Sequence, residues 1–187
     1  MSKVCGVLAA LAAAAALTGC GGPAAEPAAS STSDAPVITG EPAGFNDADV
    51  MFADEMVDRH RTAVALADAV PQRSTNADVI DLAQRIGAQQ QAEINALNVF
   101  LVQWDKRPKM GDGPVPPEVA QLQTLQGPAF DRRWLQSMID QHRGSIALAQ
   151  EEISGGKNVD VMAMAKTMVS TQTAELNQMT TMLEGSP

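Results

Sequence analysis

The sequence predicts an all-α domain made of two similar helical hairpins, and three features of the chain lead to this prediction. The second half repeats the first at one constant offset and without a gap: Met138, Asp140, His142, Gln172 and Glu175 correspond to Met56, Asp58, His60, Gln90 and Glu93. Apolar residues recur with a helical period in both halves, and no segment alternates as a strand does. Clusters of Pro and Gly separate the periodic segments. We therefore expect a four-helix bundle whose two hairpins are joined by a long crossover.

The first repeat is expected to cover residues 46–104. Its first helix runs over residues 46–70 and ends at Pro71, because proline does not continue a helix. Its second helix runs from Asn76, a good N-cap residue, to the end of the repeat. Only residues 72–75 separate these helices, and so short a loop implies that they are antiparallel neighbours.

The second repeat, residues 128–184, is expected to have the same plan. A helix over residues 128–153 is followed by a Gly-rich turn, and Asn158 can cap the last helix. The two repeats are joined by residues 105–127, which are rich in Pro and Gly and can hold a short helical turn around residues 118–125. A connection of this length is long for a bundle, as in folds in which one crossover joins two hairpins.

The N-terminus is predicted to be a lipoprotein signal peptide covering residues 1–19. Lys3 is followed by a short Ala-rich apolar stretch, too short to span a bilayer. The stretch ends in Leu-Thr-Gly-Cys, which resembles a bacterial lipobox, so Cys20 would carry the lipid after cleavage. The alternative is an ordinary signal peptide with an incidental cysteine. Residues 20–44 then form the lipidated cysteine and a flexible tether rich in Ala, Pro and Gly, and residues 45–184 form the helical domain.

Composition limits the partners of the protein. The chain of 187 residues has 13 Lys and Arg against 22 Asp and Glu, and only 3% of its residues are aromatic. It lacks the basic runs of a nucleic-acid-binding protein, so nucleic acid is not an expected partner. Because the domain is acidic, its membrane partner would be held by the hydrocarbon of the lipid on Cys20 rather than by charge. We expect the protein on the extracytoplasmic face of the cell membrane, anchored by lipid.

Both histidines of the chain are predicted to lie in the core. On a helical wheel, Asp49, Phe52 and His60 lie within roughly 40° of Met56, on the apolar face. Glu93 and Gln90 lie on the apolar face of the next helix, and His142, Glu175 and Gln172 occupy the equivalent positions of the second repeat. A buried carboxylate needs a partner, so the glutamates are expected to meet the histidines, supported by the glutamines. Whether each histidine meets the glutamate of its own hairpin or of the other is left open.

Two interpretations of these four side chains remain. In the first they form a metal site, with His60 and His142 as primary ligands and Glu93 and Glu175 as ligands or as their supports, because imidazole and carboxylate on facing helices are how bundles hold metals. In the second they form a layer of hydrogen bonds that sets helix register, with no metal.

Met56 and Met138 stand one helical turn before the two histidines, on the same face. A thioether beside an imidazole is a soft ligand set that favours Cu(I). The alternative is that these methionines only fill the core, as flexible side chains often do.

No enzymatic activity is expected. The helical domain has no cysteine, no recognisable Ser/His/Asp spacing and no Gly-rich phosphate loop. The Glu-x-x-His motif of di-iron bundles is absent, since Val57 and Ile139 stand where its glutamates would be. Arg61 and Arg143 also recur, and their spacing predicts that they point into solvent.

The repeated motifs resemble a bacterial family of secreted proteins known as domain of unknown function 305. The matching segments are Met-(Ile/Val)-x-x-His, at 56–60 and 138–142, and Gln-x-x-Glu-(Ile/Leu), at 90–94 and 172–176. The resemblance implies a ferritin-like fold and, as in some members, copper binding. The family motif has two adjacent histidines, and here Arg59 and Gln141 replace the first of each pair.

Together these features predict a lipid-anchored, extracytoplasmic, ferritin-like protein that binds a metal ion, with copper as the first choice. The alternative is a structural or adaptor module of the cell envelope with a polar core layer and no metal.

Overall fold

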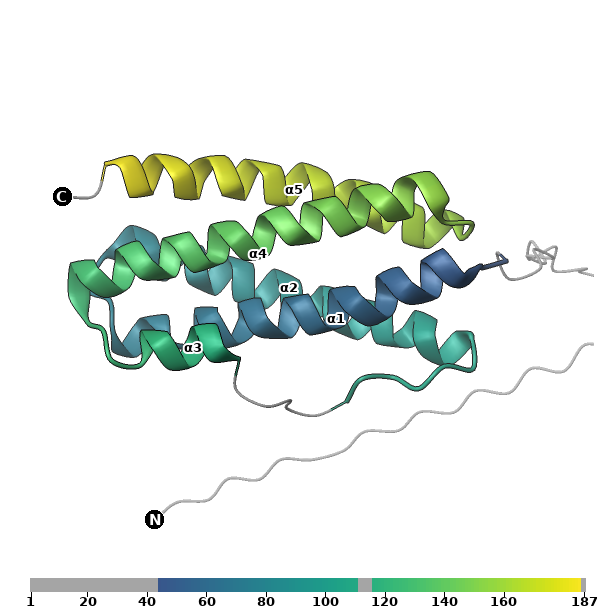
Figure 1. Cartoon of the computed structure of the whole chain (residues 1–187), viewed down its shortest axis with the longest axis horizontal. Helices are drawn as coiled ribbons and strands as arrows, with labels where there is room; N and C mark the ends of the chain where they lie inside the picture. The colour runs from purple at the N-terminus through teal and green to yellow at the C-terminus, as the bar shows by residue number, and fades with distance from the viewer. Residues whose placement is uncertain (1–43, 111–115, 186–187) are drawn as a thin grey trace, which may run out of the picture. The chain divides into compact units, whose positions relative to one another are not determined.

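The structure is a computed structural model that describes residues 44–110 and 116–185 (Figure 1). The predicted signal peptide, Cys20 and all of the predicted tether except its last residue lie outside this part. The described elements are α1 (Asp47–Asp68), a short 3-10 helix η1 (Val70–Gln72), α2 (Ala77–Gln103), α3 (Pro117–Leu122), α4 (Gly127–Gly155) and α5 (Val159–Glu184). No strand occurs among these residues, so the all-α prediction is confirmed. None of these helices has a stretch long and apolar enough to cross a bilayer.

Asparagine side chains begin three of the four long helices. Asn46, Asn76 and Asn158 each accept hydrogen bonds from two backbone N–H groups of the first turn that follows. These bonds satisfy donors that have no partner within the helix. The fourth, α4, has no side-chain cap and begins at Gly127, whose φ of 55° favours glycine.

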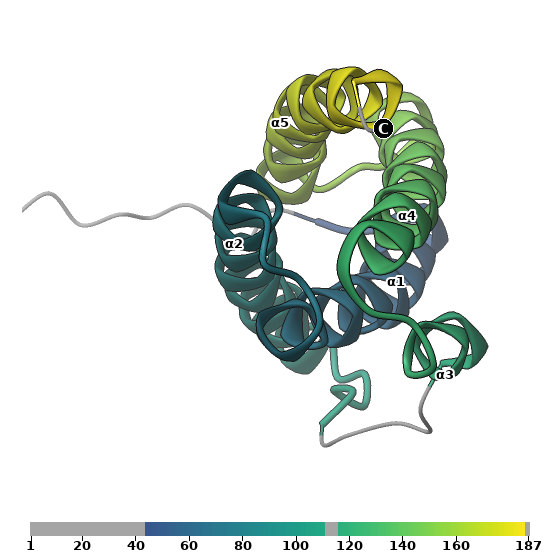
Figure 2. The ribbon, with the colours of Figure 1, turned by 90° about the vertical axis from the view of Figure 1, so that its left-hand side faces the viewer.

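The long helices pack in pairs around one core, as the view along the bundle shows (Figure 2). α1 packs on α2 and α4 packs on α5, which are the two predicted hairpins, and α1 and α4 form the main contact between them. α3, the short helix expected in the crossover, packs against α1 and α4. The core helices α1 and α5 run in one direction and α2 and α4 in the other.

The apolar core consists of two clusters, one in each half of the bundle. The Trp134 cluster contains buried residues from the end of α1, the start of α2 and the start of α4, together with Met179 of α5. The Phe52 cluster contains residues from the start of α1, the end of α2, the end of α4 and the start of α5. Burying a large apolar side chain contributes about 1.5–3 kcal/mol, so each cluster stabilises its own half.

Hydrogen bonds and ion pairs hold the first part of the crossover against α1 and α2. Asn98 of α2 accepts a hydrogen bond from the backbone nitrogen of Lys109 (2.7 Å) and donates one to its carbonyl oxygen (3.1 Å). The Lys109 ammonium forms ion pairs with Asp54 and Asp58 of α1. Burial lowers the pKa of Lys109, but these carboxylates outweigh it and raise the pKa above its ordinary value.

One prediction about this region was wrong. Arg61 does not point into solvent: its guanidinium donates to the carbonyl oxygen of Lys109, and its side chain is only 25% exposed. The crossover covers this face of α1, which the sequence pattern of one helix does not reveal. Its counterpart Arg143 has no such cover and is 65% exposed, as expected, 3.6 Å from Asp140.

Candidate functional site

A layer of polar side chains, buried except for the partly buried Glu93, separates the two apolar clusters. It consists of His60 of α1, Gln90 and Glu93 of α2, His142 of α4, and Gln172 and Glu175 of α5. In each helix these residues fall between members of one cluster and members of the other. Both histidines are fully buried. The sequence therefore placed five of these residues correctly in the core, and Glu93 is partly buried at its edge.

Each histidine pairs with the glutamate of its own hairpin. His60 Nε2 lies 2.7 Å from Glu93 Oε2, and His142 Nε2 lies 2.9 Å from Glu175 Oε2. Both pairs join residues 33 positions apart, as the internal repeat requires. The structure thus answers the question that the sequence left open.

The two histidines differ at their other ring nitrogen. His142 Nδ1 lies 3.1 Å from the carbonyl oxygen of Met138, one turn earlier. His60 Nδ1 is buried and has no hydrogen-bond partner within the described residues. The repeat is therefore symmetric in its residues but not in its hydrogen bonds.

This difference assigns the ring protons. A carbonyl oxygen only accepts, so His142 Nδ1 carries a proton, and a second proton must be shared between His142 Nε2 and Glu175. His60 needs a proton only on Nε2, which donates to Glu93, and its Nδ1 then presents a free lone pair. His60 is therefore the histidine of the layer whose Nδ1 has no partner among the described residues.

The glutamates connect the layer to the surface. The side chain of Glu93 is 14% exposed and that of Glu175 is 9% exposed, whereas both imidazoles are at 0%. Gln89 Nε2 donates to the second carboxylate oxygen of Glu93 at 3.1 Å. The support predicted from Gln90 and Gln172 is not seen: the side-chain oxygen of Gln90 and both polar side-chain atoms of Gln172 have no partner among the described residues.

Met56 and Met138 are fully buried on opposite sides of the layer. Met56 belongs to the Phe52 cluster and Met138 to the Trp134 cluster. The two thioethers therefore pack into separate halves of the core. The four predicted His and Glu ligands likewise form two pairs. Within residues 44–110 and 116–185, no three His, Cys, Asp or Glu side chains are grouped so that they could hold a metal ion together.

A second buried acidic pair, Asp49 of α1 and Glu152 of α4, joins the two hairpins. Asp49 is 0% and Glu152 is 1% exposed. Asp49 accepts hydrogen bonds from the backbone nitrogens of Asn46 (2.6 Å), Lys157 (3.1 Å) and Asn158 (2.8 Å). It thereby ties the start of α1 to the turn between α4 and α5.

The two carboxyl groups of this pair have opposite pKa shifts. Burial, together with the hydrogen bond and negative charge of Asp49, raises the pKa of Glu152 to about 8. Burial also raises the pKa of Asp49, but hydrogen bonds outweigh burial and lower this pKa below its ordinary value. The donors are the backbone N–H groups of Asn158 and Asn46, the Glu152 carboxyl and the backbone N–H of Lys157. At neutral pH Glu152 is therefore protonated and Asp49 is ionised.

Sequence reasoning placed Asp49 on the core face but did not identify its partner. Glu152 corresponds to Val70 in the first repeat, so the internal repeat carries no sign of it. The signal that could have found it is the need of a buried carboxylate for a partner, which holds for Asp49 as it does for Glu93 and Glu175.

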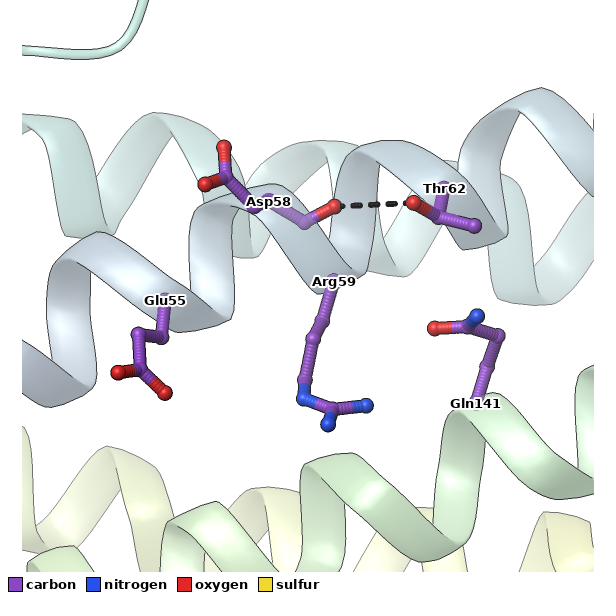
Figure 3. A pocket seen from close by; sticks show the side chains of 5 residues that line it. All are labelled: Glu55, Asp58, Arg59, Thr62 and Gln141. Carbon is purple, nitrogen blue, oxygen red and sulfur yellow. Dashed lines mark hydrogen bonds between the residues drawn. The ribbon is translucent and has the colours of Figure 1, made fainter. Parts of the chain in front are cut away.

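Arg59 and Gln141, which replace the first histidines of the family motif, line a shallow depression between α1 and α4 (Figure 3). Its volume is about 330 Å³, and Glu55, Asp58 and Thr62 of α1 complete its lining. The Arg59 guanidinium lies over Gly144 of α4, where an added Cβ would overlap it. These two positions therefore lie at the surface between the hairpins, whereas the histidines beside them point into the core.

Comparison with known proteins identifies the family. The model of the family described as domain of unknown function (DUF305) matches residues 49–183. A crystal structure of a DUF305 fragment from Deinococcus radiodurans is 27% identical, with a TM-score of 0.67, over 77% of this chain and 99% of that one. A DUF305 protein from Streptomyces coelicolor, thought to be secreted, is 27% identical, with a TM-score of 0.65, over 73% and 91%.

The fold is also that of CopM, a protein solved in copper-bound and silver-bound forms. Its Cu(II)-bound form is 26% identical to this chain, with a TM-score of 0.64, over 73% of this chain and 96% of that one. Its silver-bound form, obtained by soaking, is also 26% identical, with a TM-score of 0.64. No curated protein sequence matches this chain. The family match covers most of the chain and includes both repeats, and the chain therefore belongs to the DUF305 family.

Proposed function

We propose that this protein is a lipid-anchored, extracytoplasmic DUF305 protein of ferritin-like fold that binds a copper ion at the His60 half of its polar layer. The observation that carries the proposal is His60 Nδ1, a buried ring nitrogen without a hydrogen-bond partner among the described residues, on a ring whose Nε2 lies 2.7 Å from Glu93. Histidines that bind metals in proteins almost always donate their second N–H to a carboxylate or a carbonyl. The Glu93–His60 pair has this arrangement, with Glu93 as the group that orients the ring.

An unpartnered buried polar atom also costs stability. Leaving a buried acceptor without a hydrogen bond costs about 1–3 kcal/mol, and a metal ion at Nδ1 would remove that cost. At the equivalent atom of His142, the carbonyl of Met138 occupies the position that an ion would need. The proposal therefore assigns one ion to each chain, with His60 as the primary ligand and the His142–Glu175 pair as a structural counterpart.

The donor set favours a soft ion. Structural zinc sites use four protein ligands of the Cys, His, Asp or Glu type, a set that the described residues do not group together. Cu(I) accepts few ligands and favours thioethers, and Met56 is buried one turn before His60. The similarity to CopM, solved with copper and silver, supports the same choice. The proposal includes no catalytic role.

The experiment is a titration of Cu(I) into the mature chain, with Ag(I) as a redox-inert probe. We expect one equivalent to bind to the wild type, His60→Ala to abolish binding, and Met56→Leu to weaken it at least several-fold. The matched control is His142→Ala, which removes the equivalent imidazole and should retain binding. Equal losses in the two histidine variants, or no binding by the wild type, would contradict the His60 site.

Lipid anchoring is tested separately at Cys20. We expect the protein to label with a radioactive fatty acid and to sediment with membranes, and Cys20→Ser to release it. Retention of the Cys20→Ser protein on membranes would show that the residue is not the anchor.

A second candidate function is a metal-free structural or adaptor module of the cell envelope. The direct His–Glu hydrogen bonds of 2.7 and 2.9 Å in both repeats favour it, because they can hold the bundle in register without an ion. In that case His60→Ala and His142→Ala both have a lower free energy of unfolding than the wild type. Copper then leaves the melting temperatures of the wild type and of both variants unchanged.

A further inference from the structure

Large apolar side chains that are exposed to solvent gather at one end of the helical domain. They are Phe45 (40% exposed), Met51 (47%), Val99 (55%), Val102 (56%) and Val159 (64%), which we call the apolar end patch. They belong to the start of α1, the last turns of α2 and the first residue of α5. Among the described residues only one other large apolar side chain is exposed, Met110 in the crossover. The opposite end of the bundle, as far as the structure describes it, therefore has no such patch.

Direct contacts bring these segments together at one end. The ring of Phe45, before α1, stacks on Trp104, at the end of α2, with their centroids 5.0 Å apart. Asn46 donates to the carbonyl oxygen of Gly155, at the end of α4, at 2.8 Å. Asp49 accepts from the α4–α5 turn. Figure 1 shows the start of α1, the end of α2 and the α4–α5 turn at the same end of the bundle.

The predicted tether enters the domain at this patch. Gly44 is the last residue of the tether and directly precedes Phe45. A flexible chain of the length of residues 20–44 has an r.m.s. end-to-end distance of roughly 25–30 Å. The end of the bundle that carries the exposed apolar side chains is therefore the end at which the predicted tether joins the domain.

We propose that the apolar end patch docks on the surface of the lipid bilayer in which the chain is anchored. This inference rests on the lipid anchor of the proposed function and is independent of copper binding. A tether of this length keeps the patch at a millimolar effective concentration beside the bilayer, so a few apolar side chains are enough for docking although they would not hold an untethered protein.

The charges around the patch indicate how it docks. Lys106, Arg107 and Lys157 are exposed at this end, but so are Asp47, Asp105 and Asp160. Cations and anions balance, so attraction to anionic lipid contributes little and burial of apolar surface drives the contact. Docking is therefore expected on neutral phosphatidylcholine and is expected to be insensitive to salt.

Docking by this end sets the height of the polar layer above the membrane. His60 lies thirteen residues along α1 from its first residue, Asp47, which corresponds to roughly 20 Å of helical rise. The Trp134 cluster lies beyond the layer, in the half farther from the membrane. The two tryptophans of the chain therefore lie at different heights, Trp104 near the bilayer and Trp134 far from it.

The tryptophans are the probes for the test. The full-length chain, produced with its leader so that Cys20 is acylated, is reconstituted into phosphatidylcholine vesicles that contain brominated acyl chains. Trp134→Phe leaves only Trp104, and Trp104→Phe leaves only Trp134. Bromine quenches tryptophan only at short range, so we expect the emission of Trp104 to fall several-fold more than that of Trp134.

Charge substitutions then test the patch itself. In the Trp134→Phe background, Val102→Glu/Val159→Glu should abolish quenching while the protein still floats with the vesicles. The matched control is Gln123→Glu/Asn177→Glu, which adds the same charge at exposed positions at the opposite end and should leave quenching unchanged. Equal quenching of the two tryptophans, or quenching that survives the valine substitutions, overturns the inference.

Flotation separates this inference from the lipid anchor. A wild-type chain that does not float with the vesicles contradicts the anchor and removes the basis of docking. A chain that floats without quenching of Trp104 retains the anchor and overturns docking alone. A concentration-dependent dimer in detergent that the valine substitutions abolish would assign the patch to a second copy of the chain, which also overturns the proposal.

Discussion

Glu152 is a buried carboxyl group whose ionisation affects the folded state. It is 1% exposed and faces the Asp49 carboxylate, and neither of its oxygens accepts a hydrogen bond from a described N–H group. The three backbone N–H groups of the site donate to Asp49 and stabilise its ionised form. The proton of the pair therefore stays on Glu152. The start of α1 is thus joined to the end of α4 by a carboxyl–carboxylate pair that requires one proton.

Because the pKa of Glu152 rises from 4.5 to about 8 on folding, the protein should lose stability as the pH rises. Between these two values the folded state binds the proton and the unfolded state does not. The contribution of this proton to the free energy of unfolding is therefore complete below pH 4.5 and lost near pH 8. A single proton gives a slope of up to about 1.4 kcal/mol per pH unit. Urea unfolding of the wild type and of Glu152→Gln between pH 5 and 9 measures it.

The amide introduced by Glu152→Gln can donate to Asp49 at every pH. The difference in free energy of unfolding between this variant and the wild type should therefore grow as the pH rises toward the pKa of Glu152. Both proteins contain the same histidines, whose titration cancels in the difference. Parallel stability curves would show that Glu152 is not protonated in the folded state.

At the scale of the elements, the contact between α1 and α4 joins unlike residues of the two repeats. Arg59 of α1 lies over Gly144 of α4, whereas Gln141 and Thr62 occupy the corresponding positions of the other repeat. Figure 3 shows Arg59 pointing from α1 toward α4 and Gln141 pointing from α4 toward α1. The larger side chain on one helix is matched by the absence of a side chain on the other.

Gly144→Ala should therefore raise the free energy of unfolding by the full helix preference of Ala over Gly only when Arg59 is absent. Ala in a helix interior is about 1 kcal/mol more favourable than Gly. With Arg59 present, the new methyl group displaces the guanidinium, and part of this gain is lost. We expect the full gain in an Arg59→Ala background and a smaller gain in the wild type. Urea unfolding of the four proteins of this double-mutant cycle measures the coupling, and equal gains in both backgrounds would exclude it.

At the scale of the whole molecule, the core is two apolar clusters divided by one polar layer. An apolar layer would complete a continuous core, and buried ion pairs replaced by apolar residues of similar size often leave stability unchanged or raise it by about 1–4 kcal/mol. The layer is thus a poor device for stability alone. Its two halves have different roles in the proposed function. Within the described residues, His60 Nδ1 has no hydrogen-bond partner, whereas both ring nitrogens of His142 have one.

The double variant His142→Leu/Glu175→Leu should fold with unchanged or higher stability and should still bind copper. By contrast, His142→Ala leaves the Glu175 carboxylate buried without its partner and should cost about 3 kcal/mol or more. Thermal unfolding, with and without Cu(I), compares the three proteins. A double variant less stable than the single one would show that the pair stabilises the bundle.

Local sequence patterns predicted the helices and their buried faces well. Asn76 and Asn158 cap the helices that the sequence assigned to them, and His60, His142 and Glu175 lie in the core as their helical period required, with Glu93 partly buried beside His60. The pattern could not show that the crossover covers Arg61, since that contact joins residues far apart in the chain. The predicted leader, Cys20 and nearly all of the tether lie outside the described residues and stay predictions.

The sequence by itself determined the fold class, the internal repeat and the residues of the polar layer, because period, caps and helix breakers act over a few residues. Only the tertiary structure decided that each histidine meets its own hairpin's glutamate, that His60 rather than His142 keeps a free nitrogen, and that Asp49 meets Glu152. These outcomes depend on which helices are neighbours and on how side chains cross between them. A repeat predicts equivalent positions, but contacts between unlike residues, such as Glu152 in place of Val70, make the two halves differ.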